Sequence, residues 1–116
     1  MTTEQILWGF TKLSVLVVGD ICLDRWCMYD PELSEASRET GIPRIAVVST
    51  EVTPGAGGTV ANNLVALGAY RVAVLGVFGD DGFGEELRRA LEARNISTEF
   101  MVKARVPTFT YTKLIN

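Results

Sequence analysis

Two aspartates follow the first apolar run of the chain, and they are the residues best placed to bind a polyol. The run Ser14–Val18 is continuous and β-branched, and Asp20 and Asp24 come shortly after it. Such a run is typical of a strand buried in a parallel sheet, and open α/β sheets bind ligands at the carboxyl ends of their strands. One ionised carboxylate accepts two hydroxyl hydrogen bonds, which suits vicinal hydroxyls. We interpret Asp24 as ligand-binding, because it lies in an apolar and aromatic stretch, and Asp20 as a turn cap.

A glycine-rich segment, Thr53–Gly58, is the second candidate. We predict a turn here that leads into a helix over 60–67, ended by Gly68. Gly57 and Gly58 would present free backbone N–H groups at the helix N-terminus, where oxygens of a polyol or a phosphate can bind. A tight turn without any ligand is the structural alternative.

The elements that must position these residues follow an α/β pattern. Apolar periodicity separates helices from buried strands, and glycine and proline mark the breaks between them. The predicted order is a helix capped by Thr3 and ending at Leu13, strand 14–18, strand-like arms and a loop over 21–43, strand 44–52, helix 60–67, strand 72–78, helix 83–94, and strands 98–102 and 109–115.

Composition and charge exclude several classes of partner. Acidic residues outnumber basic ones by 14 to 11, which gives a formal net charge of −3. Nucleic acid is not an expected partner, because no basic patch is present to neutralise phosphates. No stretch approaches the roughly 18 apolar residues that span a bilayer, and the N-terminus lacks a signal-peptide pattern. We therefore expect a cytoplasmic protein with no membrane partner.

The residues also exclude several kinds of catalytic site. The chain has no histidine, so no imidazole-dependent triad is possible, and it has only two cysteines, Cys22 and Cys27. Two thiols are half of a tetrahedral zinc site, so we predict reduced thiols and no metal site. Neither a G-x-G-x-x-G motif after the first strand nor a G-x-x-x-x-G-K-[ST] motif occurs, which excludes the usual dinucleotide and P-loop sites.

Three segments together resemble the PfkB (ribokinase-like) carbohydrate kinases. Val17–Trp26 is similar to the opening of that family, and its Leu-Asp-Arg-aromatic ending is similar to the heptose-phosphate kinase branch. Pro54–Gly68 resembles the glycine-glycine sugar-binding turn with its following helix, and Gly79–Gly84 resembles the next turn. The similarity runs from about residue 14 to the end of the chain.

This resemblance implies a partial ribokinase-like fold over residues 1–116: a mostly parallel sheet with helices, and a small β-lid from arms near 21–50 and 99–116. It implies ATP-dependent phosphorylation of a sugar or sugar phosphate with Mg²⁺. By the same resemblance, Asp24 would bind sugar hydroxyls, and Gly57 and Gly58 would offer backbone N–H groups. The family has an asparagine after the glycine pair. Spacing from Gly58 places it at Asn62, whereas an ungapped match places Thr59 there.

The family's G-A-G-D motif, which carries the catalytic base and the anion hole, does not occur in the chain. We therefore expect a substrate-binding and lid portion that has no catalytic residue, binds ATP and Mg²⁺ at best weakly, and is inactive alone. The alternative is a stand-alone sugar-binding or regulatory module. A reading frame that continues past Asn116 would favour the first, and a stop codon the second. We also expect a homo-oligomer formed through the β-lid, because a thin lid leaves strand edges and apolar side chains exposed.

Overall fold

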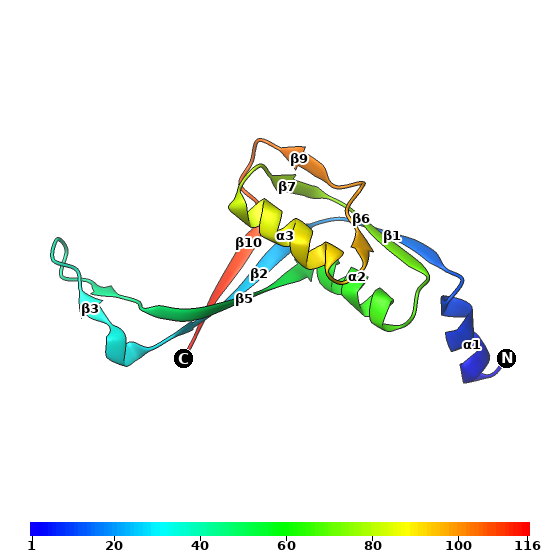
Figure 1. Cartoon of the computed structure of the whole chain (residues 1–116), viewed down its shortest axis with the longest axis horizontal. Coiled ribbons are helices and arrows are strands. Elements are labelled where there is room, and N and C mark those ends of the chain that lie inside the picture. Colours follow the sequence, from blue (N-terminus) through cyan, green and yellow to red (C-terminus); the bar gives the residue numbers. More distant parts are fainter.

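The computed structural model describes residues 1–116 and has an elongated shape, with extents of 65 × 34 × 18 Å. Its radius of gyration is 18.3 Å, whereas a compact domain of this length has about 13 Å. Figure 1 shows the reason: a ribbon of strands leaves the central body on one side, and helix α1 projects at the opposite end. No helix is long and apolar enough to cross a membrane.

The chain alternates short helices with strands. In sequence order the elements are α1 (Thr3–Phe10), β1 (Ser14–Val18), β2 (Ile21–Tyr29), the 3-10 turn η1 (Pro31–Leu33), β3 (Glu35–Ala36), β4 (Pro43–Arg44), β5 (Val47–Ala56), α2 (Gly57–Ala66), β6 (Arg71–Leu75), β7 (Val77–Gly79), α3 (Gly82–Glu92), β8 (Ile96–Ser97), β9 (Val102–Ala104) and β10 (Thr110–Ile115).

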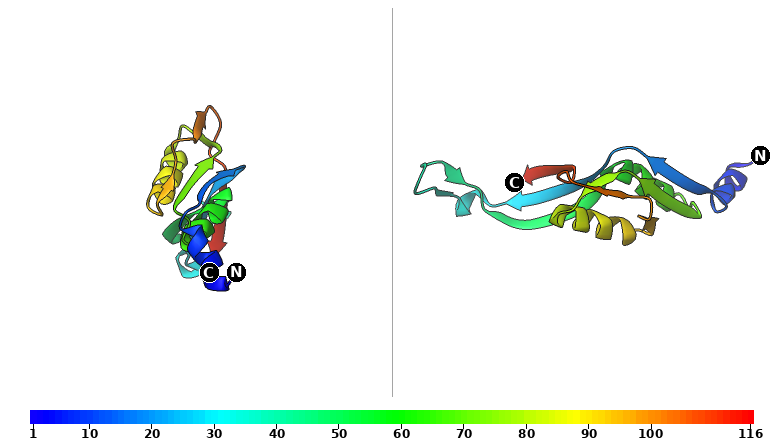
Figure 2. Two further views of the ribbon diagram at one scale, coloured as in Figure 1. Left: turned by 90° about the vertical axis from the view of Figure 1, so that its right-hand side faces the viewer. Right: turned by 90° about the horizontal axis from the view of Figure 1, so that it is seen from above.

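The main sheet consists of β1, β6 and β8 in the order β1-β6-β8, with all strands parallel. Helices α2 and α3 pack against one of its faces (Figure 2), because their apolar stripes meet the inward side chains of β6. The eight residues of this core are Ile21, Leu23, Ala61, Val72, Val74, Leu87, Leu91 and Ile96.

A second sheet, here called the arm sheet, has the order β10-β2-β5. Strand β10 runs parallel to β2, and β5 runs antiparallel to it. The short β3–β4 hairpin forms the tip of this ribbon (Figure 1). Ile21 and Leu23, at the start of β2, belong to the core and so join the arm sheet to the main body.

The structure confirms the α/β class, the first strand, the arms and the three helices, with small shifts of their ends. The first helix is capped by Thr2 rather than Thr3: the Thr2 hydroxyl accepts from the N–H of Gln5, and the Gln5 side chain accepts from the N–H of Thr2. This reciprocal capping box satisfies two N–H groups of the first turn, which fixes the start of the helix.

Three expectations were wrong in detail. Thr53–Ala56 is not a turn but the end of β5, and the chain changes direction at Ala56, with φ 53° and ψ −121°. The expected strand 72–78 divides at Gly76, and its second part, β7, pairs with β9 instead of the main sheet. The expected strand 98–102 is replaced by β8 and β9, separated by a turn.

Candidate functional site

Asp24 lies in the middle of the arm sheet rather than at the carboxyl end of the first strand. On β2 it is in register with Thr53 of β5 and with Tyr111 of β10. Successive side chains of a strand point to opposite faces. Leu23 is in the core, so Asp24 points to the face away from it, and its side chain is 17% exposed. Of the two predicted aspartates, only Asp20 directly follows β1.

The Asp24 carboxylate is held by neighbours on three sides. The Cys22 thiol donates a hydrogen bond to Oδ1 over 3.7 Å, and Lys113 Nζ lies 3.9 Å from Oδ2. Gly55 borders the same oxygen: a Cβ at this position would come within 2.6 Å of both Asp24 Oδ2 and the Cys22 sulfur. A side chain at position 55 would therefore force the carboxylate and the thiol to shift.

Lys113 is held in place by an indole ring as well as by the carboxylate. Its Nζ lies 3.9 Å from the centroid of the Trp26 ring, a cation–π contact. Trp26 is fixed in turn, because its Nε1 donates to the hydroxyl of Thr53 over 3.1 Å. The Trp26 face is thus occupied by a side chain of the protein itself.

The Cys22 thiol remains protonated at neutral pH. Burial, and after it the nearby Asp24 carboxylate, together raise its pKa to about 11. A thiolate at this position would be desolvated and would lie beside a second negative charge. Cys22 is therefore a hydrogen-bond donor here and not a nucleophile.

The two predicted glycines are placed differently from the prediction. The N–H of Gly57 is not free, because it donates to the carbonyl of Asp20 over 2.8 Å. Gly58 is buried, and a Cβ there would come within 2.6 Å of the Pro54 side chain. Both glycines permit close packing where β5 runs directly into α2. The glycine that borders Asp24 is Gly55, which lies in the predicted glycine-rich segment but was not singled out within it.

Thr59 and Asn62, the two candidates for the polar residue after the glycine pair, both lie on α2. Thr59 and Asn62 are both exposed, whereas Ala61 faces the core. The Thr59 hydroxyl donates to the carbonyl of Pro54 over 3.4 Å, so it is engaged with the end of β5. No side chain caps the first turn of α2, and the N–H of Gly57 is satisfied by the carbonyl of Asp20 instead.

A groove lies at the carboxyl ends of β1 and β6, next to the arm sheet. Asp20 lines it, as does Phe109 just before β10. The Phe109 and Tyr111 rings are in contact, with centroids 5.0 Å apart, and Tyr111 is in register with Asp24. The aromatic pair thus extends from the groove, at Phe109, to the residue in register with Asp24, Tyr111. The remaining lining residues are Val18, Gly19, Ile21, Leu75, Gly76, Val77, Val106 and Pro107.

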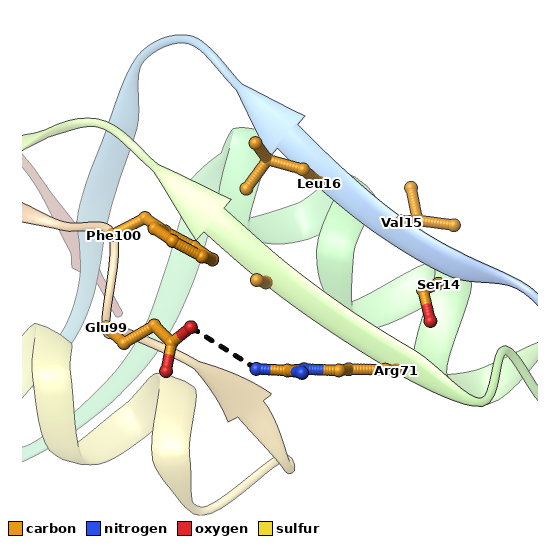
Figure 3. A pocket seen from close by; sticks show the side chains of 7 residues that line it. Ser14, Val15, Leu16, Arg71, Glu99 and Phe100 are labelled. Carbon is orange, nitrogen blue, oxygen red and sulfur yellow. Dashed lines mark hydrogen bonds and ion pairs between the residues drawn. The ribbon is translucent and has the colours of Figure 1, made fainter.

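A second hollow lies on the main sheet, near the amino ends of β1 and β6 (Figure 3). Ser14 and Leu16 line it, and an ion pair between Arg71 and Glu99, with N and O 3.3 Å apart, crosses its floor. Ligands of open parallel sheets bind at the opposite, carboxyl ends of the strands. We therefore assign the candidate site to the groove and the arm sheet.

Thr108 anchors β10, and the sequence gave no reason to single it out. Its backbone N–H and its hydroxyl both donate to the carboxylate of Asp81, over 2.9 and 2.5 Å. Asp81 also caps α3 by accepting from the N–H of Gly84 over 2.7 Å. These hydrogen bonds, the Thr108 hydroxyl foremost, lower the pKa of Asp81. Asp81 thus caps α3 and also fixes the start of β10.

The arrangement of strands and helices is that of ribokinase-fold sugar kinases. The fructokinase with bound ATP from Xylella fastidiosa superposes with a TM-score of 0.64 at 21% identity, covering 90% of this chain and 30% of that one. The fructokinase of Halothermothrix orenii gives a TM-score of 0.58 at 22% identity, covering 88% and 34%. The present chain is thus part of that fold.

Residues 12–116 match the pfkB family of carbohydrate kinases, and the chain belongs to this family. The bifunctional protein HldE of Erwinia tasmaniensis is 36% identical over 107 residues, which are 92% of this chain and 22% of that protein. HldE of Chromohalobacter salexigens is 37% identical over 102 residues, 88% and 21% of the two chains. The chain spans about a fifth of the length of these curated relatives.

Proposed function

We propose that this chain forms the sugar-binding and lid portion of an ATP-dependent kinase that acts on a sugar or sugar phosphate. Family membership supports the kinase class. The observation that carries the assignment of the site is Asp24, a partly exposed carboxylate held beside Gly55 and in register with Tyr111, whose ring contacts the groove residue Phe109. A carboxylate so held accepts two hydroxyl hydrogen bonds without reorganising.

The proposed role of this portion is to orient the substrate. Asp24 would accept from vicinal hydroxyls, and the first turn of α2, which no side chain caps, would donate to another oxygen beside Thr59 and Asn62. Phosphoryl transfer also needs groups that surround the phosphates, and neither a P-loop nor a G-A-G-D motif occurs in residues 1–116. We therefore assign no residue of this chain to ATP or Mg²⁺ and propose that it is inactive by itself.

The Asp24→Asn variant tests the sugar site. Loss of a charge-assisted hydrogen bond, worth about 1.5–3 kcal/mol, should weaken sugar affinity about ten- to a hundredfold and leave thermal stability nearly unchanged. Calorimetry on the whole gene product, with ribose, fructose and their phosphates as probes, measures both. Glu51→Gln is the matched control, since Glu51 is an exposed carboxylate on the same sheet. Equal affinities of Asp24→Asn and the wild type would exclude Asp24 from the site.

Inactivity alone has a separate test. The purified 116-residue chain, incubated with Mg-ATP and the same sugars, should form no phosphorylated product. Turnover that Asp24→Ala abolishes would contradict this part of the proposal. It would also show that residues 1–116 contain a catalytic group outside the known motifs.

We also propose that the arm sheet mediates self-association. Ile45 and Val47 are 53% and 45% exposed near the tip of the ribbon, and Tyr111 is 54% exposed on β10. Exposed strands with apolar side chains pair readily with a second chain, and Tyr29 and Phe109 would lie near such an interface. Light scattering at micromolar concentration should detect a dimer or larger species. A monodisperse, folded 12.7 kDa species would contradict the proposal.

A further inference from the structure

Two side chains that touch Asp24 have no place in the sugar-binding scheme described so far. Cys22 is 1% exposed and lies on the same strand and the same face as Asp24, with its sulfur 3.7 Å from Oδ1. Lys113 comes from the neighbouring strand, and its Nζ lies 3.9 Å from Oδ2. The two contacts engage different oxygens of one carboxylate.

We propose that Cys22 and Lys113 are positioning residues, which hold the Asp24 carboxylate in the orientation that accepts substrate hydroxyls. This inference rests on the proposed function, since it concerns how the same site is kept ready for its ligand. A thiol donor on one oxygen and an ammonium group near the other restrict rotation of the carboxylate. Their effect on the substrate is therefore indirect and acts through Asp24.

The surroundings of Cys22 keep its thiol protonated, so that it can always donate a hydrogen bond. The thiol is buried and its raised pKa keeps the proton on sulfur, so Oδ1 always faces an S–H group. Gly55 lets the sulfur and the carboxylate approach, because any Cβ there would lie within 2.6 Å of both groups. The three residues thus form one packed unit on the face of the arm sheet.

Lys113 is held by an aromatic ring as well as by the carboxylate. Its ammonium group lies over the Trp26 ring, which Thr53 holds by a hydrogen bond. The Lys113 side chain is 44% exposed, so without the Trp26 ring it would lose considerable rotamer freedom on pairing with Asp24. The indole restricts that freedom in advance, so the positive charge stays near Oδ2 both with and without ligand.

Cys27 provides a control within the same strand. It is also buried, at 2% exposure, but lies on the opposite face from Cys22, and its sulfur accepts a hydrogen bond from the Thr50 hydroxyl over 3.8 Å. No carboxylate contacts it. Replacing each cysteine therefore separates the loss of a buried thiol from the loss of a donor to Asp24.

The thiol contact is tested first without any ligand. Infrared spectra of the 116-residue chain should show two S–H stretching bands, assigned by their loss in Cys22→Ala and Cys27→Ala. The Cys22 band should lie at the lower frequency, because this thiol donates to a carboxylate. It should move to higher frequency in Asp24→Ala, while the Cys27 band stays in place. A Cys22 band that Asp24→Ala leaves unmoved would overturn the proposed contact.

Binding measurements on the whole gene product, with the sugars and sugar phosphates named above, test the consequence. Cys22→Ala should weaken affinity about three- to tenfold, and Cys22→Ser, which restores a donor, should recover most of it. Lys113→Met should weaken affinity about two- to fivefold, with recovery in Lys113→Arg. Cys27→Ala should bind as the wild type does.

The outcomes distinguish this inference from the proposed function. If Asp24→Asn loses affinity while Cys22→Ala and Lys113→Met bind as the wild type does, the positioning role is wrong and the sugar site stands. If Asp24→Asn binds normally, the sugar site itself is wrong, and the positioning role fails with it. If Cys22→Ser fails to recover the loss in Cys22→Ala, the effect is one of packing and the donor role is overturned.

Discussion

The main sheet and the arm sheet are stabilised by different forces. Side chains from α2 and α3 cover one face of the main sheet, and Leu87 and Leu91 are completely buried there. The arm sheet has no helix over its Asp24 face, and its β10 residues Tyr111 and Leu114 are 54% and 49% exposed. Burial of apolar area therefore stabilises the body, whereas strand ladders and polar contacts hold the arms.

This difference explains why a binding site can form on the arms. A fully packed core excludes an unpaired carboxylate, because burying a charge without a partner is costly. On the arm sheet Asp24 keeps access to solvent and a cation nearby. The start of β2 ties the two regions together, since Ile21 and Leu23 belong to the core while Asp24 faces outward.

The largest expected effect is on the core. Leu87→Ala removes a completely buried side chain and should lower the free energy of unfolding by about 2–5 kcal/mol. Leu114→Ala, the same change at a half-exposed site on β10, should cost less than about 1 kcal/mol. Urea unfolding followed by circular dichroism measures both values. Similar losses at the two sites would contradict the contrast between the sheets.

The body was more predictable from sequence than the arms, and the reason is physical. The run Ser14–Val18 and the apolar stripe of α3 are local patterns, so their elements could be predicted within a few residues. The neighbours of Asp24 depend on the pairing of β2 with β5 and with β10, strands that lie far from β2 in the chain. No local pattern specifies such a register, so Gly55 and Lys113 could not be assigned from sequence.

Asp20 and Gly57 illustrate the same limit at the boundary between the two regions. Asp20 was interpreted as a turn cap, and Gly57 was predicted to offer a free N–H group to a ligand. In the structure the N–H of Gly57 instead donates to the carbonyl of Asp20. This bond joins the start of β2 to the start of α2, and it exists because β5 pairs with β2 up to Ala56. Local spacing identified the right segments but not which of their groups are already paired.

An intermediate effect is expected at the anchor of β10. Thr108→Val keeps the shape of the buried side chain but leaves the N–H of Gly79 without the hydroxyl that accepts from it over 2.9 Å. The free energy of unfolding should fall by about 1–3 kcal/mol. Thr112→Val, at an exposed position of β10, removes only a solvent-exposed hydrogen bond, which Arg25 donates to the Thr112 hydroxyl over 3.1 Å, and should cost about 0.5 kcal/mol or less. Urea unfolding at neutral pH measures both.

Thr108→Val should also change how the stability of the fold responds to acid. The pKa of Asp81 is lowered in the folded state, mainly by the Thr108 hydroxyl, so its ionised form stabilises the fold above the ordinary aspartate range. That contribution is lost as the pH falls from about 4 through the lowered folded-state pKa. Without the hydroxyl the shift is smaller, so Thr108→Val should lose less of its stability over this interval. An acid unfolding profile parallel to that of the wild type would contradict this account.

The smallest expected effect concerns the junction of β5 and α2, where a substitution should raise the free energy of unfolding instead of lowering it. Ala56 has φ 53° and ψ −121°, a backbone conformation that glycine adopts without strain and alanine does not. Ala56→Gly should therefore raise the free energy of unfolding by about 1 kcal/mol, after allowance for the greater freedom of glycine in the unfolded chain. Thermal unfolding of the 116-residue chain measures the change.

The same substitution, alanine to glycine, at the other end of α2 is the control for this prediction. Ala66 is exposed in the last turn of α2, where a glycine brings no relief of strain, so Ala66→Gly should destabilise the chain by about 0.5–1 kcal/mol. The two variants should thus move the melting temperature in opposite directions. If both lower it, the backbone at Ala56 is not strained, and the junction between arms and body is set by the packing of Gly57 and Gly58 alone.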